Sequence, residues 1–196
     1  RLNSSPAEAL GILLSPLTGR EVDPQGWSVI YHVRLPRILL ALAVGMGLSV
    51  SGASFQSLFS NPLATPDTLG VATGASFGAV LALLFTRNIL VVQMAALLMG
   101  LAALAGTCLI SRLNGKSSIL MVVLGGMVVS SLFQALVSLA KYVADPEEDL
   151  PAITYWLMGS MSRATYQGLA VGIPLILLGV AVLFLLRWRL NILSLQ

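Results

Sequence analysis

Residues 34–80 read RLPRILLALAVGMGLSVSGASFQSLFSNPLATPDTLGVATGASFGAV, and this stretch decides the fold. It opens two apolar runs, roughly Leu35–Phe59 and Leu69–Phe85, each about as long as a helix that crosses a bilayer. Between them lies the polar break Asn61–Asp67, whose two prolines predict that one helix ends there and another begins. The stretch therefore predicts two membrane helices joined by a short turn.

Small residues recur at every fourth position along both runs. In lipid, where packing rather than the hydrophobic effect holds helices together, such rows let two helix backbones approach closely. We therefore predict helix packing through two rows, which are Gly45, Ser49, Ala53 and Ser57 in the first run and Gly70, Gly74, Gly78 and Ala82 in the second.

The composition excludes an ordinary soluble domain. Hydrophobic residues make up 57% of the chain and charged residues 10%, whereas an average soluble domain has about 25% charged residues. The mean hydropathy is +0.90. The net charge of +3 is spread along the chain and does not form a nucleic-acid patch. The class predicted is an all-α integral membrane protein with no nucleic-acid partner.

Further apolar runs extend the pattern to a polytopic bundle of about five transmembrane helices. These runs are roughly Ile89–Leu109, Ser118–Val143 and Leu169–Leu186. Ile153–Ser160 is apolar but too short to cross, and its Tyr155 and Trp156 favour the lipid–water boundary. We expect a short interfacial helix there. The domain organisation predicted is an extracytoplasmic segment over 1–33 and a transmembrane domain over 34–196.

Intramembrane catalysis would need a nucleophile with a base, or a metal cluster. The apolar runs contain no Asp, Glu or His, so we predict no catalytic residue, no metal site and no cofactor. His32 has no neighbouring ligand and is interpreted as an interfacial residue beside Tyr31. The acidic loop 145–149 lacks the alternating ligands of a calcium loop and is interpreted as solvated. Cys108 has no partner for an internal disulfide because it is the single cysteine.

Polar residues occur in two places that have both a structural and a functional interpretation. Gly126, Ser130 and Gln134 fall on one helix face, which indicates either hydrogen bonding between helices or a water-filled path. Arg34 and Arg37 lie three positions apart at the head of the first run. They suit either snorkelling to lipid headgroups or docking of carboxylates from a partner. The residues alone leave both alternatives open.

The ordered motifs resemble those of a known family. They are the Arg34-Leu35-Pro36-Arg37 entry, Ser51-Gly52-Ala53 with Gln56, the Asn61-Pro62-Leu63-Ala64 break, and Leu69-Gly70 followed by Gly74-Ala75 and Gly78-Ala79. Together they resemble FecCD-type permeases, the membrane subunits of ATP-driven importers of iron–siderophore complexes, haem and cobalamin. The resemblance covers nearly the whole chain, and the chain corresponds to the front half of the family fold, without its first helix and its C-terminal half.

The resemblance implies roles for individual residues. Arg34 and Arg37 match arginines that face the outside and receive glutamates of a substrate-binding protein. Gly126, Ser130 and Gln134 fall on the helix that lines the translocation path. Tyr155, Trp156 and Gly159 match a short helix beside the outer gate.

The resemblance also implies partners and a location. These are a second permease copy or sister subunit, two ATPase subunits, an extracytoplasmic substrate-binding protein and the inner or plasma membrane of a bacterial cell. Transport would proceed by alternating access between two permease copies. ATP hydrolysis is expected on a partner, because the chain has no Walker loop. The alternative is a structural membrane piece or helical scaffold without transport.

The orientation is predicted differently by charge and by resemblance. Five crossings place residues 1–33, Arg87 and the loop 144–166 on one side of the membrane. That side carries more Lys and Arg than the other, so the positive-inside rule favours it as cytoplasmic. The resemblance implies that the same side lies outside, and we adopt that orientation as the expectation.

Overall fold

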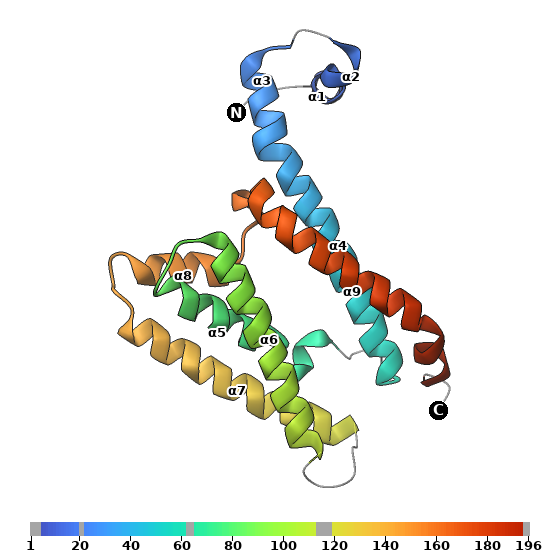
Figure 1. The fold of residues 1–196 in the computed structure, drawn as a ribbon, viewed down its shortest axis with the longest axis vertical. Coiled ribbons are helices and arrows are strands. Elements are labelled where there is room, and N and C mark those ends of the chain that lie inside the picture. Colours follow the sequence, from blue (N-terminus) through green and yellow to red (C-terminus); the bar gives the residue numbers. More distant parts are fainter. Residues whose placement is uncertain (1–4, 20–21, 62–64, 113–118, 194–196) are drawn as a thin grey trace.

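The computed structural model describes residues 5–19, 22–61, 65–112 and 119–193, and these residues form helices and connecting turns without a β-strand (Figure 1). The α-helices are α1 (Pro6–Leu13), α2 (Ser15–Thr18), α3 (Pro24–Val29), α4 (Leu35–Leu58), α5 (Val71–Leu83), α6 (Ile89–Arg112), α7 (Ile119–Val143), α8 (Asp149–Met158) and α9 (Tyr166–Leu193). A π-helical turn, η1 (Ile30–Arg34), and two 3₁₀ turns, η2 (Pro66–Leu69) and η3 (Met161–Arg163), connect some of them.

Four helices of the described chain are long and apolar enough to cross a membrane. They span Pro24–Leu58, Ile89–Arg112, Leu120–Val143 and Tyr166–Ile192. The all-α membrane class predicted from the sequence is confirmed, and the chain is a multi-pass membrane protein.

The second apolar run forms a shorter helix than predicted. Helix α5 has 13 residues, which at 1.5 Å per residue extend about 20 Å and fall short of a bilayer core of about 30 Å. At its start, the backbone of Gly70 adopts φ +74°, a left-handed conformation that ends η2 and separates it from α5. At its other end the helix stops at Leu83, two residues before the predicted Phe85.

The first membrane helix begins earlier than predicted. The sequence predicts a start at Arg34–Pro36, but α3, η1 and α4 form one continuous helical segment from Pro24. The π turn makes this possible: the Leu35 N–H donates to the Ile30 carbonyl, one residue farther back than in an α-helix. The predicted domain boundary at residues 33/34 therefore falls inside a helix.

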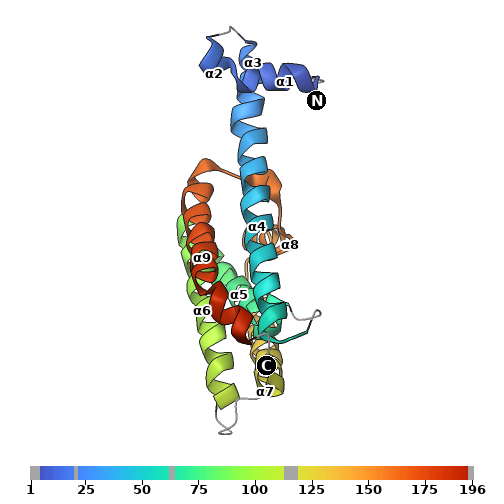
Figure 2. The same cartoon turned by 90° about the vertical axis from the view of Figure 1, so that its right-hand side faces the viewer.

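The helices form two groups (Figure 1). Helices α4 and α9 run side by side in the same direction, and the Ser57 hydroxyl donates to the Leu190 carbonyl near their ends at 3.5 Å. Helices α5 to α8 form the second group. The segment α1–α3 projects from one end of α4, away from this second group (Figure 2).

The core lies in the second group, around α5. Ala79 and Val80 of α5 and Ile153 of α8 are fully buried, and Val92 of α6 is 1% exposed. Thr107 of α6 is also fully buried, and its hydroxyl donates to the Leu69 carbonyl at 2.9 Å. Helix α5, which is shorter than the four candidate membrane spans, is thus the one around which α6, α7 and α8 pack.

Candidate functional site

The Arg34–Arg37 corner is built on an irregular piece of helix. Pro36 has no N–H, so the carbonyl it would pair with in the π register, that of Tyr31, lacks a donor from the helix. The Tyr166 hydroxyl, at the start of α9, donates to this Tyr31 carbonyl at 2.5 Å. The first residue of α9 thus compensates for the proline of α4.

A second contact connects the same two regions. The Arg37 Nη2 donates to the Ser162 carbonyl at 3.0 Å, and Ser162 belongs to η3, between α8 and α9. Arg37 is exposed and Arg34 is half-buried. The corner therefore presents a cationic, solvent-facing guanidinium whose position is linked to the segment that follows α8.

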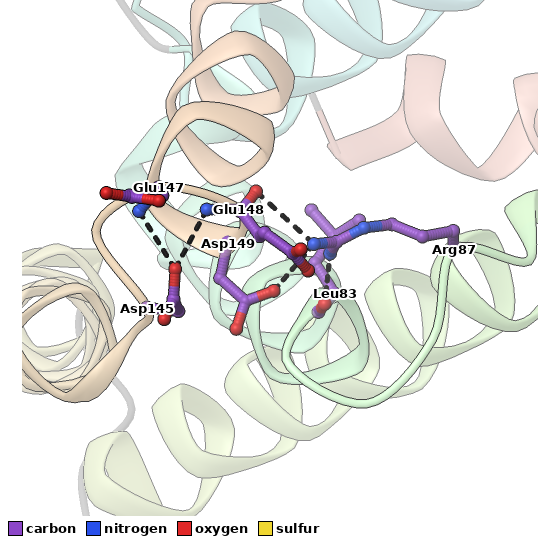
Figure 3. Close-up of polar contacts among 6 residues, drawn as sticks. All are labelled: Leu83, Arg87, Asp145, Glu147, Glu148 and Asp149. Atoms are coloured by element: carbon purple, nitrogen blue, oxygen red, sulfur yellow. Dashed lines mark hydrogen bonds and ion pairs between the residues drawn. The ribbon is translucent and has the colours of Figure 1, made fainter.

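Helix α8, the predicted gate helix, is anchored at its first turn (Figure 3). The Arg87 Nη2 lies 2.6 Å from Asp149 Oδ1 and also donates to the Glu148 carbonyl at 3.3 Å. The Arg87 Nη1 donates to the Leu83 carbonyl at the end of α5. One arginine therefore holds the end of α5 to the start of α8.

The loop before α8 is organised by Asp145. Its Oδ1 accepts the backbone N–H groups of Glu147 and Glu148, each at 2.9 Å (Figure 3). These bonds, the one from Glu148 first and then the one from Glu147, lower the pKa of the fully exposed Asp145 carboxyl. The acidic loop is thus a solvated turn in which the Asp145 carboxylate accepts hydrogen bonds from the loop's own backbone. Groups of three or more potential metal ligands are absent from the described ranges.

The far end of α8 is less enclosed than its middle. Ile153 is fully buried, while Tyr155 is 60% exposed and Trp156 is half-buried. Gly159 ends the helix with φ +69°, and nothing lies within 4 Å of an added Cβ there. The predicted gate residues therefore lie where α8 gives way to an open turn, and their role at a gate stays a prediction.

A cavity of about 700 Å³ lies between the two helix groups. Residues from α4, α6, α8 and α9 line it, including Leu40, Gln93, Trp156 and Thr165. The Gln93 Nε2 donates to the Gly168 carbonyl at 3.3 Å, and its buried Oε1 has no partner in the described chain. All three predicted gate residues, Tyr155, Trp156 and Gly159, line this cavity.

The polar stripe on α7 lies in more than one environment. Gly126 is buried, and a Cβ there would collide with the Thr68 carbonyl of η2. A Cβ on Gly70 would lie 3.1 Å from the Ser130 hydroxyl, so Ser130 also faces this contact. Gln134 is exposed. Gly126 and Ser130 thus have the geometry of helix packing, and the translocation path through these residues stays a prediction.

The two rows of small residues also differ. A Cβ at Gly74 would lie 2.5 Å from the Ala103 Cβ, and one at Gly78 would lie 2.8 Å from the Met99 Cβ, so both glycines lie against α6. In the first row Gly45, Ser49 and Ala53 are exposed.

Helix α4 meets α9 through a neighbouring face. A Cβ on Gly47 would lie 3.1 Å from Ile176, whereas an added Cβ at Gly45 would meet nothing within 4 Å. Ser57 of the first row contacts α9, whereas packing of Gly45, Ser49 and Ala53 against another helix stays a prediction.

Tyr166 and the Arg87–Asp149 pair were not predicted from the sequence. The signal for the first was Pro36, which leaves a carbonyl without its usual donor because the helical segment begins before it, at Pro24. The sequence shows neither that earlier start nor which side chain replaces the missing donor. The signal for the second was a lone cation, Arg87, in an apolar region. Its partner lies 62 positions away in the chain, so local spacing could not reveal it.

Comparisons with known proteins agree with this architecture. Residues 3–196 match the FecCD transport family. The molybdate import permease MolB of Haemophilus influenzae is 44% identical over 94% of this chain and 55% of its own length. A probable iron chelatin permease of Helicobacter pylori is 40% identical over 86% of this chain and 50% of its own length. The haemin permease HmuU of Yersinia pestis is 32% identical over 99% of this chain and 59% of its own length.

A solved structure resembles the whole described arrangement. It is an inward-facing metal-chelate type ABC transporter, with a TM-score of 0.81 and 39% identity, and the match covers 98% of this chain and 66% of that chain. The chain spans about half the length of the curated relatives it matches.

Proposed function

The chain belongs to the FecCD transport family, and on this basis we propose that it is part of the permease subunit of an ATP-binding-cassette importer. The observation that carries the proposal is the match of helix arrangement to a transporter of this kind over 98% of the chain. Full-length relatives are about twice as long, so the proposal concerns the complete permease to which this chain corresponds.

The proposed mechanism is alternating access. Two permease copies or sister subunits enclose the path, two ATPase subunits supply the force, and a substrate-binding protein delivers the substrate from outside the inner or plasma membrane of the cell. The permease changes no covalent bond in its cargo. Its own task is to expose the path to one side at a time, and Gly126, Ser130 and Gln134 are the residues we assign to that path.

The substrate class follows from the relatives. Their names specify iron chelatin, haemin, cobalamin and molybdate. The family resemblance predicts iron–siderophore, haem or cobalamin, and the MolB relative adds a small oxyanion to this set. We propose that the substrate is a metal chelate or a metal oxyanion.

Uptake by the reconstituted transporter tests the proposal. The complete permease is placed in liposomes with its ATPase and binding protein, and a ferric siderophore, haemin, cobalamin and molybdate are offered in turn. We expect saturable, ATP-dependent accumulation of one of them, and none when the ATPase carries a substitution of its Walker lysine. A complex that hydrolyses ATP but accumulates no member of this panel would contradict the proposal and favour a scaffold.

We assign the docking of the binding protein to the Arg34–Arg37 corner. Arginine pairs with carboxylates through charge-assisted hydrogen bonds, and exposed pairs of this kind weaken as salt rises. In the complete transporter, Arg34→Glu with Arg37→Glu should abolish a salt-sensitive association with the binding protein. Arg112→Glu, at the other end of the bundle, is the matched control and should bind normally. Unchanged binding by the double variant would identify both arginines as headgroup anchors.

A further inference from the structure

We infer that Tyr166 is a positioning residue for the docking corner, because its hydroxyl supplies the hydrogen bond that Pro36 cannot. The inference rests on the proposed docking role of Arg34 and Arg37, and it adds a residue that lies 129 positions beyond Arg37, in another helix.

The backbone register makes the need for this donor specific. In an α-helix the Tyr31 carbonyl would accept the Leu35 N–H, but that N–H donates to the Ile30 carbonyl instead. In the π register its donor would be the N–H of residue 36, which is proline. The Tyr31 carbonyl is therefore left over in both registers, and the Tyr166 hydroxyl is the donor that reaches it, at 2.5 Å.

The same segment also sets the position of Arg37. Ser162, whose carbonyl accepts from Arg37 Nη2 at 3.0 Å, lies four residues before Tyr166. The two hydrogen bonds run in opposite directions between residues 31–37 and residues 162–166. Tyr166 fixes the segment to the π turn, and the segment in turn gives Arg37 a fixed acceptor. The cationic side chain is thereby held in one orientation before a partner arrives, which lowers the ordering cost of docking.

The contact lies where its effect on folding is small. Tyr166 is 46% exposed and Tyr31 is half-buried, so water can replace the lost donor at the Tyr31 carbonyl. Removal of the hydroxyl should therefore loosen the corner without unfolding the helices. If Tyr166 has a positioning role, removal of its hydroxyl lowers the affinity and leaves the melting temperature nearly unchanged. If its role is purely structural, removal lowers the melting temperature.

The test is Tyr166→Phe in the complete transporter, with affinity for the purified binding protein as the readout. We expect affinity to fall about five- to tenfold, the size expected from the loss of one oriented hydrogen bond, with the melting temperature nearly unchanged. Tyr142→Phe is the matched control, because it removes the hydroxyl of a tyrosine that is 88% exposed at the end of α7, and it should bind like the parent.

The Pro36→Ala variant, used as a second parent, shows whether the Tyr166 hydroxyl replaces the N–H that Pro36 lacks. Pro36→Ala restores an N–H that can reach the Tyr31 carbonyl in the π register, so Tyr166→Phe should cost no further affinity there. Equal losses from Tyr166→Phe in the parent and in the Pro36→Ala background would overturn the inference, as would unchanged affinity of Tyr166→Phe alone.

A direct mobility measurement decides the case if Pro36→Ala does not bind. A nitroxide on Ser162→Cys, in a Cys108→Ala background, should become more mobile when Tyr166 is replaced by Phe, and an unchanged spectrum would overturn the inference. The outcomes are distinct from failure of the proposed function. If charge reversal of Arg34 and Arg37 leaves binding intact, the docking role fails. If charge reversal abolishes binding and Tyr166→Phe does not weaken it, only the role of Tyr166 fails.

Discussion

At the scale of single residues, the described glycines differ in what surrounds the place that a Cβ would take. Gly74, Gly78 and Gly126 lie where another backbone or side chain occupies the place of a Cβ, whereas Gly11 and Gly45 have no heavy atom within 4 Å of that place. In a membrane helix the first group makes close packing possible, because small residues are what allow two backbones to approach. The same residue type thus has different consequences on substitution.

We predict that Gly78→Ala destabilises the protein. The added methyl group would collide with the Ala95 carbonyl and lie 2.8 Å from the Met99 Cβ, and overpacking of this kind costs about 1–3 kcal/mol of the free energy of unfolding. Unfolding in mixed detergent measures the change. Gly11→Ala, in open space on α1, is the control and should be neutral or slightly stabilising because Ala favours helix. Equal stability of the two variants would contradict the prediction.

The lowered pKa of Asp145 leads to a prediction about how the stability of the protein depends on pH. Its folded-state pKa is lowered by the N–H groups of Glu148 and Glu147, so its contribution to stability is present above the usual aspartate pKa of about 4 and is lost as pH falls through the lowered value. Asp145→Ala should therefore be less stable than the parent at neutral pH, and the difference should shrink on acidification. Melting curves across this range measure it. A difference that is constant with pH would show that charge is not involved.

At the scale of elements, the link between α5 and α8 joins segments that the sequence places far apart. The ends of both helices are held by Arg87, through the Leu83 carbonyl on one side and the Glu148 carbonyl and Asp149 carboxylate on the other. The side chains of Arg87 and Asp149 are 50% and 23% exposed, so solvent screens the ion pair. The backbone acceptors make Arg87 the more important partner.

We predict unequal effects from breaking this link. Arg87→Ala should lower the free energy of unfolding by about 1–2 kcal/mol, because it removes bonds to two carbonyls as well as the ion pair. Asp149→Ala should cost less than about 1 kcal/mol, as exposed pairs do. In the double variant the losses should not add, with a coupling of about 0.5 kcal/mol. Additive losses would show that the two side chains act independently.

The apolar runs of the sequence were sufficient to predict α4, α6, α7 and α9, because a bilayer crossing requires a long, uncharged segment. They were not sufficient for α5, whose start is set by the left-handed backbone at Gly70, or for the π turn before Pro36. Both depend on how the chain satisfies backbone groups in three dimensions. The Tyr166 and Arg87 contacts were likewise invisible, because each joins residues more than 60 positions apart.

At the scale of the whole molecule, the N-terminal segment and the start of α4, which carries Arg37, lie toward one end, and the C-terminus lies toward the other (Figure 1). A docking role for Arg34 and Arg37 requires that the corner face the outside of the cell. The positive-inside count favours the opposite orientation. The family resemblance and the charge distribution therefore make opposite predictions about the side of the membrane on which this corner lies. The side of the membrane on which the corner lies therefore decides between them.

The most direct measurement is labelling from outside. Gln25, an exposed residue of α3, is replaced by Cys in a Cys108→Ala background of the complete transporter, and intact cells with a permeable outer envelope are treated with a membrane-impermeant maleimide. We predict that Gln25→Cys is labelled before the inner membrane is disrupted. Labelling only after disruption would place the Arg34–Arg37 corner inside and would contradict the proposal that it is the docking surface of an importer.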